Sequence, residues 1–146
     1  MPSYRFVEEI DDRLRVDLME LYRHEWWTNQ RREDDVARML QHSDLTVGVC
    51  ADPGGQLIGC TRVLTDRVFK ALVFDVIVAQ PHRNAGLGRA LIDHVLNHPM
   101  LALVRHIELY CKPEMISFYE QWGFAAPGPE VTFLRMTRDV TATIAS

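Results

Sequence analysis

The segment from residue 83 to residue 89 has the residue types and the spacing to bind an anion. Gly86 and Gly88 allow backbone N–H groups to approach a ligand closely, because glycine has no side chain to keep it away. A helix that starts at these glycines directs the positive end of its dipole at the same place, which suits a phosphate group. Two arginines would add positive charge. In full, the segment reads Arg83, Asn84, Ala85, Gly86, Leu87, Gly88 and Arg89.

Two common phosphate-binding patterns do not fit this segment. A Walker A loop needs Lys and then Ser or Thr after its glycine, but Arg89 and Ala90 follow Gly88. A dinucleotide-binding loop needs a small residue at the position where the chain has Leu91. The pattern that remains is R-x-x-G-x-G, placed shortly after the apolar run at residues 76–78.

Apolar patterns on both sides of this loop predict the elements that must position it. Residues 71–79 are apolar apart from Asp75, as expected for a strand covered on both faces, and residues 86–97 carry apolar side chains at helical spacing. The turn residues 52–55 separate two strand-like runs and predict a hairpin. The order β-α-α-β-β-β-α-β-α-β predicts an α/β or α+β class with one mixed sheet, mostly antiparallel with a central parallel pair. The expected strands are 4–8, 45–51, 56–65, 71–79, 107–111 and 131–136, and the expected helices end near Trp26, His42, Asn97 and Gly123.

The composition is that of an ordinary globular protein and excludes several classes. The chain has 146 residues, 47% of them hydrophobic and 25% charged, with no repeat or linker, so we expect a single domain over residues 1–146. The net charge of −4 argues against nucleic acid as the main partner. No apolar run approaches the roughly 18 residues that span a membrane. We therefore expect neither a nucleic-acid-binding nor a membrane protein.

Residues 1–13 are acidic where a targeting peptide would be basic and then apolar. The three cysteines are widely spaced, and no two form a Cys-x-x-Cys pair. Each is expected to be a reduced thiol in the core rather than a nucleophile, and this pattern favours the cytoplasm. The cysteines are Cys50, Cys60 and Cys111.

A second motif lies near the end of the chain. Residues 118–124 read F-Y-E-Q-W-G-F, after an expected strand and short helix. With R-x-x-G-x-G, this segment resembles the GNAT superfamily of acyl-CoA-dependent N-acetyltransferases, whose pyrophosphate loop carries Q/R-x-x-G-x-G/A and whose later segment carries Φ-Y-x-x-x-G-F. The resemblance covers nearly the whole chain in element order. It implies the GNAT fold, a mixed sheet flanked by helices, with antiparallel N-terminal strands and a splayed central parallel pair.

A closer resemblance is carried by residues 21–22, 27–28 and 74–76. These read Leu-Tyr, Trp-Thr and Phe-Asp-Val, and they are similar to the branch that includes plant serotonin N-acetyltransferase-like and related bacterial proteins. This likeness suggests an amine substrate without identifying one.

The resemblance implies that acetyl-CoA is the cosubstrate, that no metal is required, and that the acetyl group passes directly to a primary amine of a small molecule, a peptide or a protein. It places the backbone of Val76, Ile77 and Val78 along the pantetheine arm, and the loop from Arg83 to Arg89 around the pyrophosphate. Homodimers are frequent in the family, so a homodimer is implied by analogy alone.

Two side chains are candidate catalytic residues. Tyr119 matches the family tyrosine that protonates or hydrogen-bonds the departing sulfur, and a phenol with a pKa of about 10 is protonated at neutral pH. The alternative is a half-buried tyrosine whose hydroxyl is simply anchored. Asp75 lies in an apolar strand, where burial and isolation would raise its pKa and suit a general base. It could instead bond a neighbouring backbone group or an arginine.

Other bases remain open as alternatives, namely a water chain or one of the side chains His24, Glu25, His42 and His82. Trp26 and Trp27 lie where the family covers its acceptor pocket, and aromatic walls suit an aromatic or alkyl amine, although core tryptophans are common at helix ends. Lys112 stands where the family often has Asn, which weakens any transfer of specificity. His94 and His98 have the spacing of a metal pair but lack a third ligand in the sequence, so we expect surface residues and no metal.

The favoured hypothesis is thus an acetyl-CoA-dependent N-acetyltransferase. The alternative is a non-catalytic acyl-CoA-binding regulatory module on the same fold, favoured by Lys112 and by the lack of a clear base. A protein-binding domain without a cofactor is a third and more distant hypothesis.

Overall fold

The computed structural model describes residues 3–140, which contain one five-stranded sheet and four α-helices. The strands lie in sequence order, and only the pair β4–β5 is parallel. The strands are β1 (Ser3–Val7), β2 (Leu45–Asp52), β3 (Leu57–Thr65), β4 (Lys70–Val78) and β5 (His106–Glu108). The helices are α1 (Asp12–Arg23), α2 (Glu33–His42), α3 (Leu87–Leu96) and α4 (Ile116–Glu120), with short 3-10 helices η1 (Gln80–His82), η2 (Pro99–Leu101) and η3 (Pro113–Met115).

The chain divides into two compact units at Tyr110. The first unit, residues 1–110, holds the whole sheet together with α1, α2 and α3. The second unit begins at Cys111 and holds η3 and α4. The mixed sheet with its parallel edge pair confirms the fold class predicted from the sequence.

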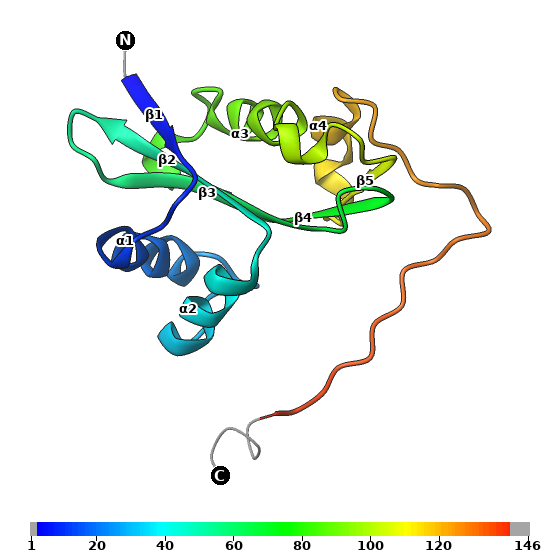
Figure 1. The fold of residues 1–146 in the computed structure, drawn as a ribbon, viewed down its shortest axis with the longest axis horizontal. Coiled ribbons are helices and arrows are strands. Elements are labelled where there is room, and N and C mark those ends of the chain that lie inside the picture. The colour runs from blue at the N-terminus through cyan, green and yellow to red at the C-terminus, as the bar shows by residue number, and fades with distance from the viewer. Residues whose placement is uncertain (1–2, 141–146) are drawn as a thin grey trace. The chain divides into compact units, whose positions relative to one another are not determined.

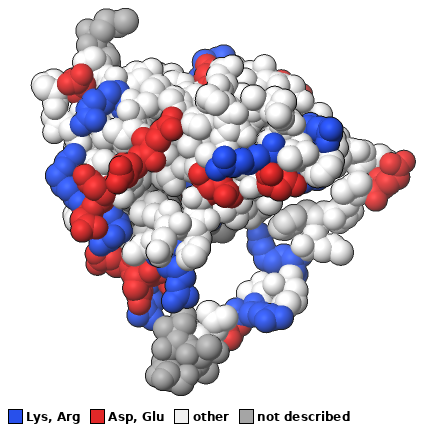
Figure 2. Space-filling model, viewed as in Figure 1, with Lys and Arg blue, Asp and Glu red and all other residues white. Residues whose placement is uncertain are grey.

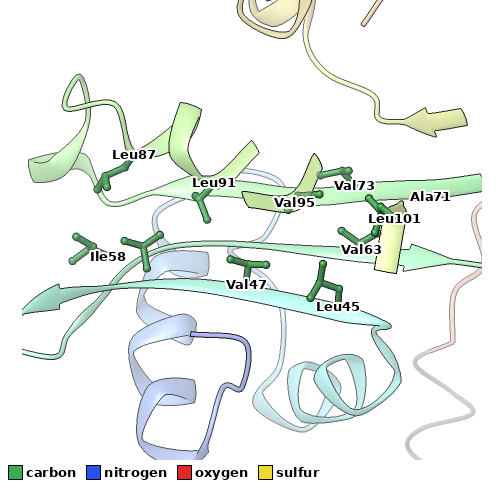
Figure 3. Close-up of a cluster of buried hydrophobic side chains, with 11 residues drawn as sticks. Leu45, Val47, Ile58, Val63, Ala71, Val73, Leu87, Leu91, Val95 and Leu101 are labelled. Carbon is green, nitrogen blue, oxygen red and sulfur yellow. The ribbon is translucent and has the colours of Figure 1, made fainter. Parts of the chain in front are cut away.

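Helix α3 covers one face of the sheet. Its apolar side chains recur at helical spacing, as the sequence predicts, and they point onto residues of β2, β3 and β4 (Figure 3). Leu91 and Val95 are completely buried there, and Leu87 is nearly so. Burial of these side chains fixes the start of α3 close to the end of β4, where the glycine loop lies.

Helices α1 and α2 cover the opposite face (Figure 1). The carboxylate of Asp11 accepts a hydrogen bond from the N–H of Leu14 at 2.8 Å and so caps the start of α1. Leu18 of α1 and Val36 of α2 are each only 1% exposed in the core on this face. The segment between the two helices, residues 24–32, is therefore held near the sheet at both of its ends.

Strand β4 is irregular where it pairs with β3. Its pairing with β3 shifts register between Cys60↔Ile77 and Arg62↔Phe74, which leaves two residues of β4 opposite Thr61. On its other edge, β4 pairs with β5 over residues 70–72 only. Within residues 3–110 the strands therefore separate after this short pairing, as a splayed parallel pair requires.

The predicted last strand, residues 131–136, is not formed. These residues carry no strand assignment, and Phe133 and Leu134 are 59% and 86% exposed. An alternating or apolar pattern makes a segment suitable for a sheet. A strand forms only where a neighbouring strand also offers hydrogen-bond partners for its backbone N–H and C=O groups. The N–H of Val131 donates instead to the carbonyl of Gly128, at 3.5 Å, and this bond closes a turn.

The remaining predicted elements differ from the structure mainly at their ends. Helix α1 ends at Arg23 instead of near Trp26, and β5 has three residues in place of the five expected over 107–111. Of the three cysteines, Cys50 and Cys60 are buried as predicted, but Cys111 is exposed, so the prediction of a core thiol is wrong there. None of the helices in the described part of the chain is long and apolar enough to cross a bilayer.

Candidate active site

The glycine loop lies between β4 and α3, as the sequence predicts. Asn84 and Gly86 both have positive φ angles, of 66° and 82°, and Gly86 is the N-cap of α3. This backbone conformation is the left-handed one that glycine and asparagine tolerate best. Because an α-helix begins there, the first N–H groups of the helix have no carbonyl partner one turn earlier. The loop therefore presents backbone donors and the positive end of a helix dipole together.

Space for a ligand is open at Gly86. A Cβ added at this residue would have no heavy atom within 4 Å, and residues 84–86 are all exposed. A phosphate group can thus approach the backbone of the loop without displacing another side chain. The loop thus has the open backbone donors that a bound phosphate group requires.

The three residues predicted to lie along the pantetheine arm are the last three of β4. Ile77 pairs with Cys60 and Val78 with Gly59, while Val76 lies in the irregular part of β4. The hydroxyl of Thr61, opposite that irregularity, donates a hydrogen bond to the carbonyl of Phe74 at 2.8 Å. Since β5 pairs no further than Leu72, the edge of β4 that faces away from β3 has no strand partner over residues 73–78 within the described sheet.

Asp75 is bonded by two arginines, which is one of the alternatives that the sequence leaves open. Its φ angle is 56°, and its side chain is 5% exposed. Arg31 donates to both carboxylate oxygens, at 2.6 and 3.1 Å, and the Nε of Arg62 donates at 2.9 Å. The guanidinium groups of these arginines stack over the rings of Tyr22 and Phe74, with 4.7 and 4.6 Å from Cζ to the ring centroids.

These contacts reverse the predicted shift of the Asp75 pKa. Burial alone would raise the pKa of this carboxyl, but the hydrogen bonds and charges of Arg31 and Arg62 outweigh burial and hold the pKa below its usual value. The prediction of a raised pKa is therefore wrong, because the carboxylate is buried but not isolated. The geometry favours the structural alternative for Asp75, while its assignment as a base stays a prediction.

Arg83 is held by two partners. Its Nε donates to the carbonyl of Val78 at 2.9 Å, and its Nη2 donates to Oε1 of Glu25 at 2.6 Å. The Glu25 side chain is 15% exposed and that of Arg83 47%. The ion pair joins the glycine loop to the segment that follows α1.

Trp26 and Trp27 follow Glu25 and are not core residues. They are 65% and 43% exposed, and their rings meet edge to face with centroids 5.7 Å apart. The segment that carries them is anchored by Thr28, whose buried hydroxyl donates to the carbonyl of Tyr22 at 2.7 Å. Both indole rings are exposed, so the alternative of core tryptophans is wrong, and the acceptor wall stays a prediction.

Tyr119 lies on α4 in the second unit and is 8% exposed. Its ring packs edge to face against Phe118 and Phe124, with centroids 5.0 and 6.0 Å away. Burial, with a smaller contribution from the charge of Cys111, raises the pKa of Tyr119 to about 12. The phenol therefore keeps its proton across the neutral range, as an acid must. Lys112, the departure from the family pattern, is exposed at the N-cap of η3.

His94 and His98 share a partner that the sequence does not show. Both donate toward the carboxylate of Glu8, with their Nε2 atoms 2.8 and 3.0 Å from its two oxygens. These hydrogen bonds lower the pKa of Glu8. The N–H of Met100 donates to Nδ1 of His98 at 3.0 Å. Among residues 3–140, no group of three or more His, Cys, Asp or Glu side chains is arranged to hold a metal ion.

Charges of both signs are interspersed over the face shown in Figure 2, where Lys and Arg side chains alternate with Asp and Glu. No continuous basic surface covers that face. An anion at the glycine loop would therefore depend on local features, above all the positive end of the dipole of α3, because Arg83 is already paired with Glu25.

One protein-family model matches most of the chain. The model of the acetyltransferase (GNAT) family matches residues 8–124, which include the glycine loop and the segment around Tyr119. The chain belongs to the GNAT family. This confirms the family resemblance that the two sequence motifs indicate.

Curated relatives within the GNAT family agree with the predicted branch. The chain is 32% identical over 98 residues to serotonin N-acetyltransferase 2, chloroplastic, of Oryza sativa, which covers 66% of this chain and 49% of that protein. It is 32% identical over 111 residues to an uncharacterized ycf52-like N-acetyltransferase of Prochlorococcus marinus, covering 75% of this chain and 61% of the relative. The chain thus spans about half to three fifths of these two relatives.

A solved structure extends the likeness over nearly the full length. A protein of the GNAT family from Xanthomonas campestris superposes with a TM-score of 0.80 and 27% identity, over 94% of this chain and 95% of that one. This neighbour confirms the GNAT fold.

Sequence patterns identify the loop and the strand but miss the ion pairs. The partners of Asp75 lie 44 and 13 residues away from it in the sequence, and Glu25 lies 58 residues from Arg83. One signal is present in the sequence, because a buried carboxylate generally requires a cation. Arg62 reaches Asp75 through the pairing of β3 with β4, and Arg31 reaches it because the segment between α1 and α2 packs against the sheet.

Proposed function

We propose that the chain is an acetyl-CoA-dependent N-acetyltransferase that transfers the acetyl group directly to a primary amine of a small molecule, a peptide or a protein. The observation that carries this proposal is the continuous path formed by β4 and the glycine loop. An unpaired strand edge within the described sheet leads into a loop of open backbone donors at a helix N-terminus. A pantetheine arm and a diphosphate are suited to those two parts in that order.

The chain's own groups would hold acetyl-CoA at two places. Backbone N–H groups at residues 84–89, with the dipole of α3, would bind the diphosphate. The free edge of β4 at Val76, Ile77 and Val78 would pair with the amide groups of the pantetheine arm. When bound, the coenzyme supplies an acetyl group activated as a thioester.

Acyl transfer then needs an oxyanion donor and an acid. A backbone N–H of β4 that lies beside the thioester oxygen would stabilise the negative charge that develops on it, because backbone donors are already oriented and need no rearrangement. The hydroxyl of Tyr119, which is protonated at neutral pH and whose pKa burial raises to about 12, would donate its proton to the departing sulfur. The family tyrosine provides the support for this role.

The attacking amine must lose a proton. Asp75 is fully engaged with Arg31 and Arg62, so we assign it the task of fixing the irregular part of β4 and not that of a base. Water in the acceptor pocket would remove the amine proton. Trp26 and Trp27 would form a wall of that pocket and favour amines with an aromatic or alkyl body.

We further propose that the chain acts as one catalytic domain in the cytoplasm, on account of its unpaired thiols. A homodimer remains an analogy with the family. These proposals are independent of the reaction itself.

The reaction is tested by measuring release of the CoA thiol from acetyl-CoA in the presence of separate arylalkylamines, polyamines, aminoglycosides, amino acids and lysine peptides. We expect release that depends on the amine and exceeds the rate without amine. The class that gives the highest kcat/KM identifies the acceptor. Binding of acetyl-CoA with no release for any amine would favour the regulatory module instead.

A further inference from the structure

We propose that Glu25 is a positioning residue for the glycine loop and that it acts through Arg83. The inference rests on the proposed function in one respect, namely that this loop holds the diphosphate of acetyl-CoA. In the sequence, Glu25 is one of several candidate bases without a spacing argument. The structure gives it a different task.

The guanidinium of Arg83 joins three segments. Its Nε donates to the carbonyl of Val78, the last residue of β4, at 2.9 Å, and its Nη2 donates to Glu25 at 2.6 Å. The acceptors are fixed, because Val78 is in the sheet and the backbone N–H of Glu25 is bonded to the carbonyl of Tyr22 at 3.2 Å. A planar guanidinium that bonds in two directions is held in one orientation.

Backbone bonds restrain the two ends of the loop more than its middle. Those at its start run from His82 to Ala79 and from Arg83 to Gln80, at 2.9 and 3.2 Å, and both precede residue 84. The next backbone bond links Ala90 to Gly86 at 3.0 Å, where α3 begins. The side chain of Arg83 is therefore a main tie between the start of the loop and the rest of the first unit.

The charges of the pair decide what kind of role it has. A carboxylate close to the diphosphate site repels an anion, and it also cancels most of the positive charge of Arg83. If the pair acted only through its charge, removal of Glu25 would strengthen anion binding. If the pair instead acts as a brace, meaning that it holds the loop in the conformation that binds the ligand, removal of Glu25 weakens anion binding. The loop must then be ordered when the ligand binds, which costs free energy. The two roles give effects of opposite sign.

The segment beyond Glu25 adds a second consequence. It carries Trp26 and Trp27 and is fixed at its far end by the buried pair of Arg31 and Asp75. The pair of Glu25 and Arg83 therefore also fixes the near end of this segment, which lies beside the glycine loop.

The first test measures the dissociation constant of acetyl-CoA by titration calorimetry for four proteins: wild type, Glu25→Gln, Arg83→Gln and the double variant. Each single change is expected to weaken binding about three- to tenfold, and the double variant is expected to bind no more weakly than the weaker single variant. The matched control is Glu20→Gln, which removes an exposed carboxylate paired with Arg23 and His24 and should leave affinity unchanged. Unchanged or tighter binding by Glu25→Gln, or additive losses in the double variant, would overturn the brace.

The second test needs no coenzyme. Amide hydrogen exchange of residues 83–89 in the free protein is expected to be faster in Glu25→Gln and Arg83→Gln than in wild type and Glu20→Gln. Equal exchange in all four proteins would overturn the proposal. Wild-type protein that binds no acetyl-CoA would contradict the proposed function, and the exchange result would then decide on the brace alone.

Discussion

Asp75 and Tyr119 are the two side chains for which the sequence predicts catalytic roles, and each is buried in its own unit. Asp75 is surrounded by charge, because Arg31 and Arg62 both bond its carboxylate. Tyr119 is surrounded by aromatic rings. Burial opposes ionisation in both cases, yet the pKa of Asp75 is lowered and that of Tyr119 is raised to about 12. The charged neighbours of each group, together with burial, therefore decide the direction in which its pKa shifts.

The comparison assigns the two residues different tasks. A carboxylate that is bonded by two arginines is stabilised in its ionised form, so Asp75 is suited to a structural role. A phenol packed among aromatic rings stays neutral and keeps a proton that it can donate. Substitutions at Asp75 should therefore affect stability most, and substitution of Tyr119 should affect the reaction.

Removal of the Asp75 carboxylate should destabilise the fold strongly. In Asp75→Ala, two arginines lose their shared partner in a largely buried site, and the free energy of unfolding should fall by about 3–5 kcal/mol. Urea unfolding followed by circular dichroism measures this change. The control Glu20→Ala removes exposed ion pairs with Arg23 and His24 and should change the free energy of unfolding by at most about 0.5 kcal/mol. A loss of similar size in both variants would contradict the structural role of Asp75.

Tyr119→Phe should affect the reaction and not the fold. Loss of a positioned proton donor is expected to lower kcat about 100-fold, while KM for acetyl-CoA changes little. Initial rates with saturating acetyl-CoA, measured with the best amine of the panel, provide the test. Tyr4→Phe, which alters an exposed tyrosine on β1, is the matched control. An unchanged kcat in Tyr119→Phe would exclude the acid role.

The lowered pKa of Asp75 predicts how stability depends on pH. A group whose pKa is lower in the folded state stabilises the fold above its unfolded pKa, about 3.9, and loses that contribution as the pH falls through the folded value. The difference in unfolding free energy between wild type and Asp75→Asn should thus be constant from about pH 8 to pH 5 and shrink in more acidic solution. A difference that grows toward low pH would show the opposite pKa shift.

The smallest effect concerns the shape of the pH–rate profile. Because the Tyr119 pKa is about 12, we expect no alkaline decline of kcat below about pH 11. If Asp75 is not the base, Asp75→Asn should keep the acidic limb of the wild-type profile at the same pH. Loss of that limb in Asp75→Asn, in a protein that circular dichroism shows to be folded, would restore Asp75 as the base.

Much of the fold could be predicted because it depends on local patterns. The hairpin between β2 and β3 follows from a turn of Asp, Pro and Gly residues, and α3 follows from apolar side chains at helical spacing. Residues 131–136 show the limit of such patterns, since a strand exists only where another strand accepts it. The fold class, by contrast, depends on element order, which the sequence shows over most of its length.

The candidate site could be predicted in part. Glycine spacing locates the loop at residues 83–89, because a helix that begins at a glycine turn after a strand produces a phosphate cradle in many proteins. Sequence spacing could not pair Glu25 with Arg83 or Arg31 with Asp75, because those contacts depend on how α1 and α2 pack on the sheet. The direction of the Asp75 pKa shift follows from these contacts, so the sequence alone leads to the wrong sign.

If β4 and the glycine loop form an acyl-coenzyme A site, the affinity for acetyl-CoA must depend on Gly86. Acetyl-CoA is titrated into wild type, Gly86→Val and Gly55→Val. The two glycines have nearly equal φ angles, 82° and 81°, so both variants place valine at a φ angle that it rarely adopts, but only Gly86 lies in the loop. We expect wild type and Gly55→Val to bind with similar affinity and Gly86→Val to bind at least about 100-fold more weakly. Equal affinity of all three proteins, or no binding by wild type, would contradict the assignment of this site.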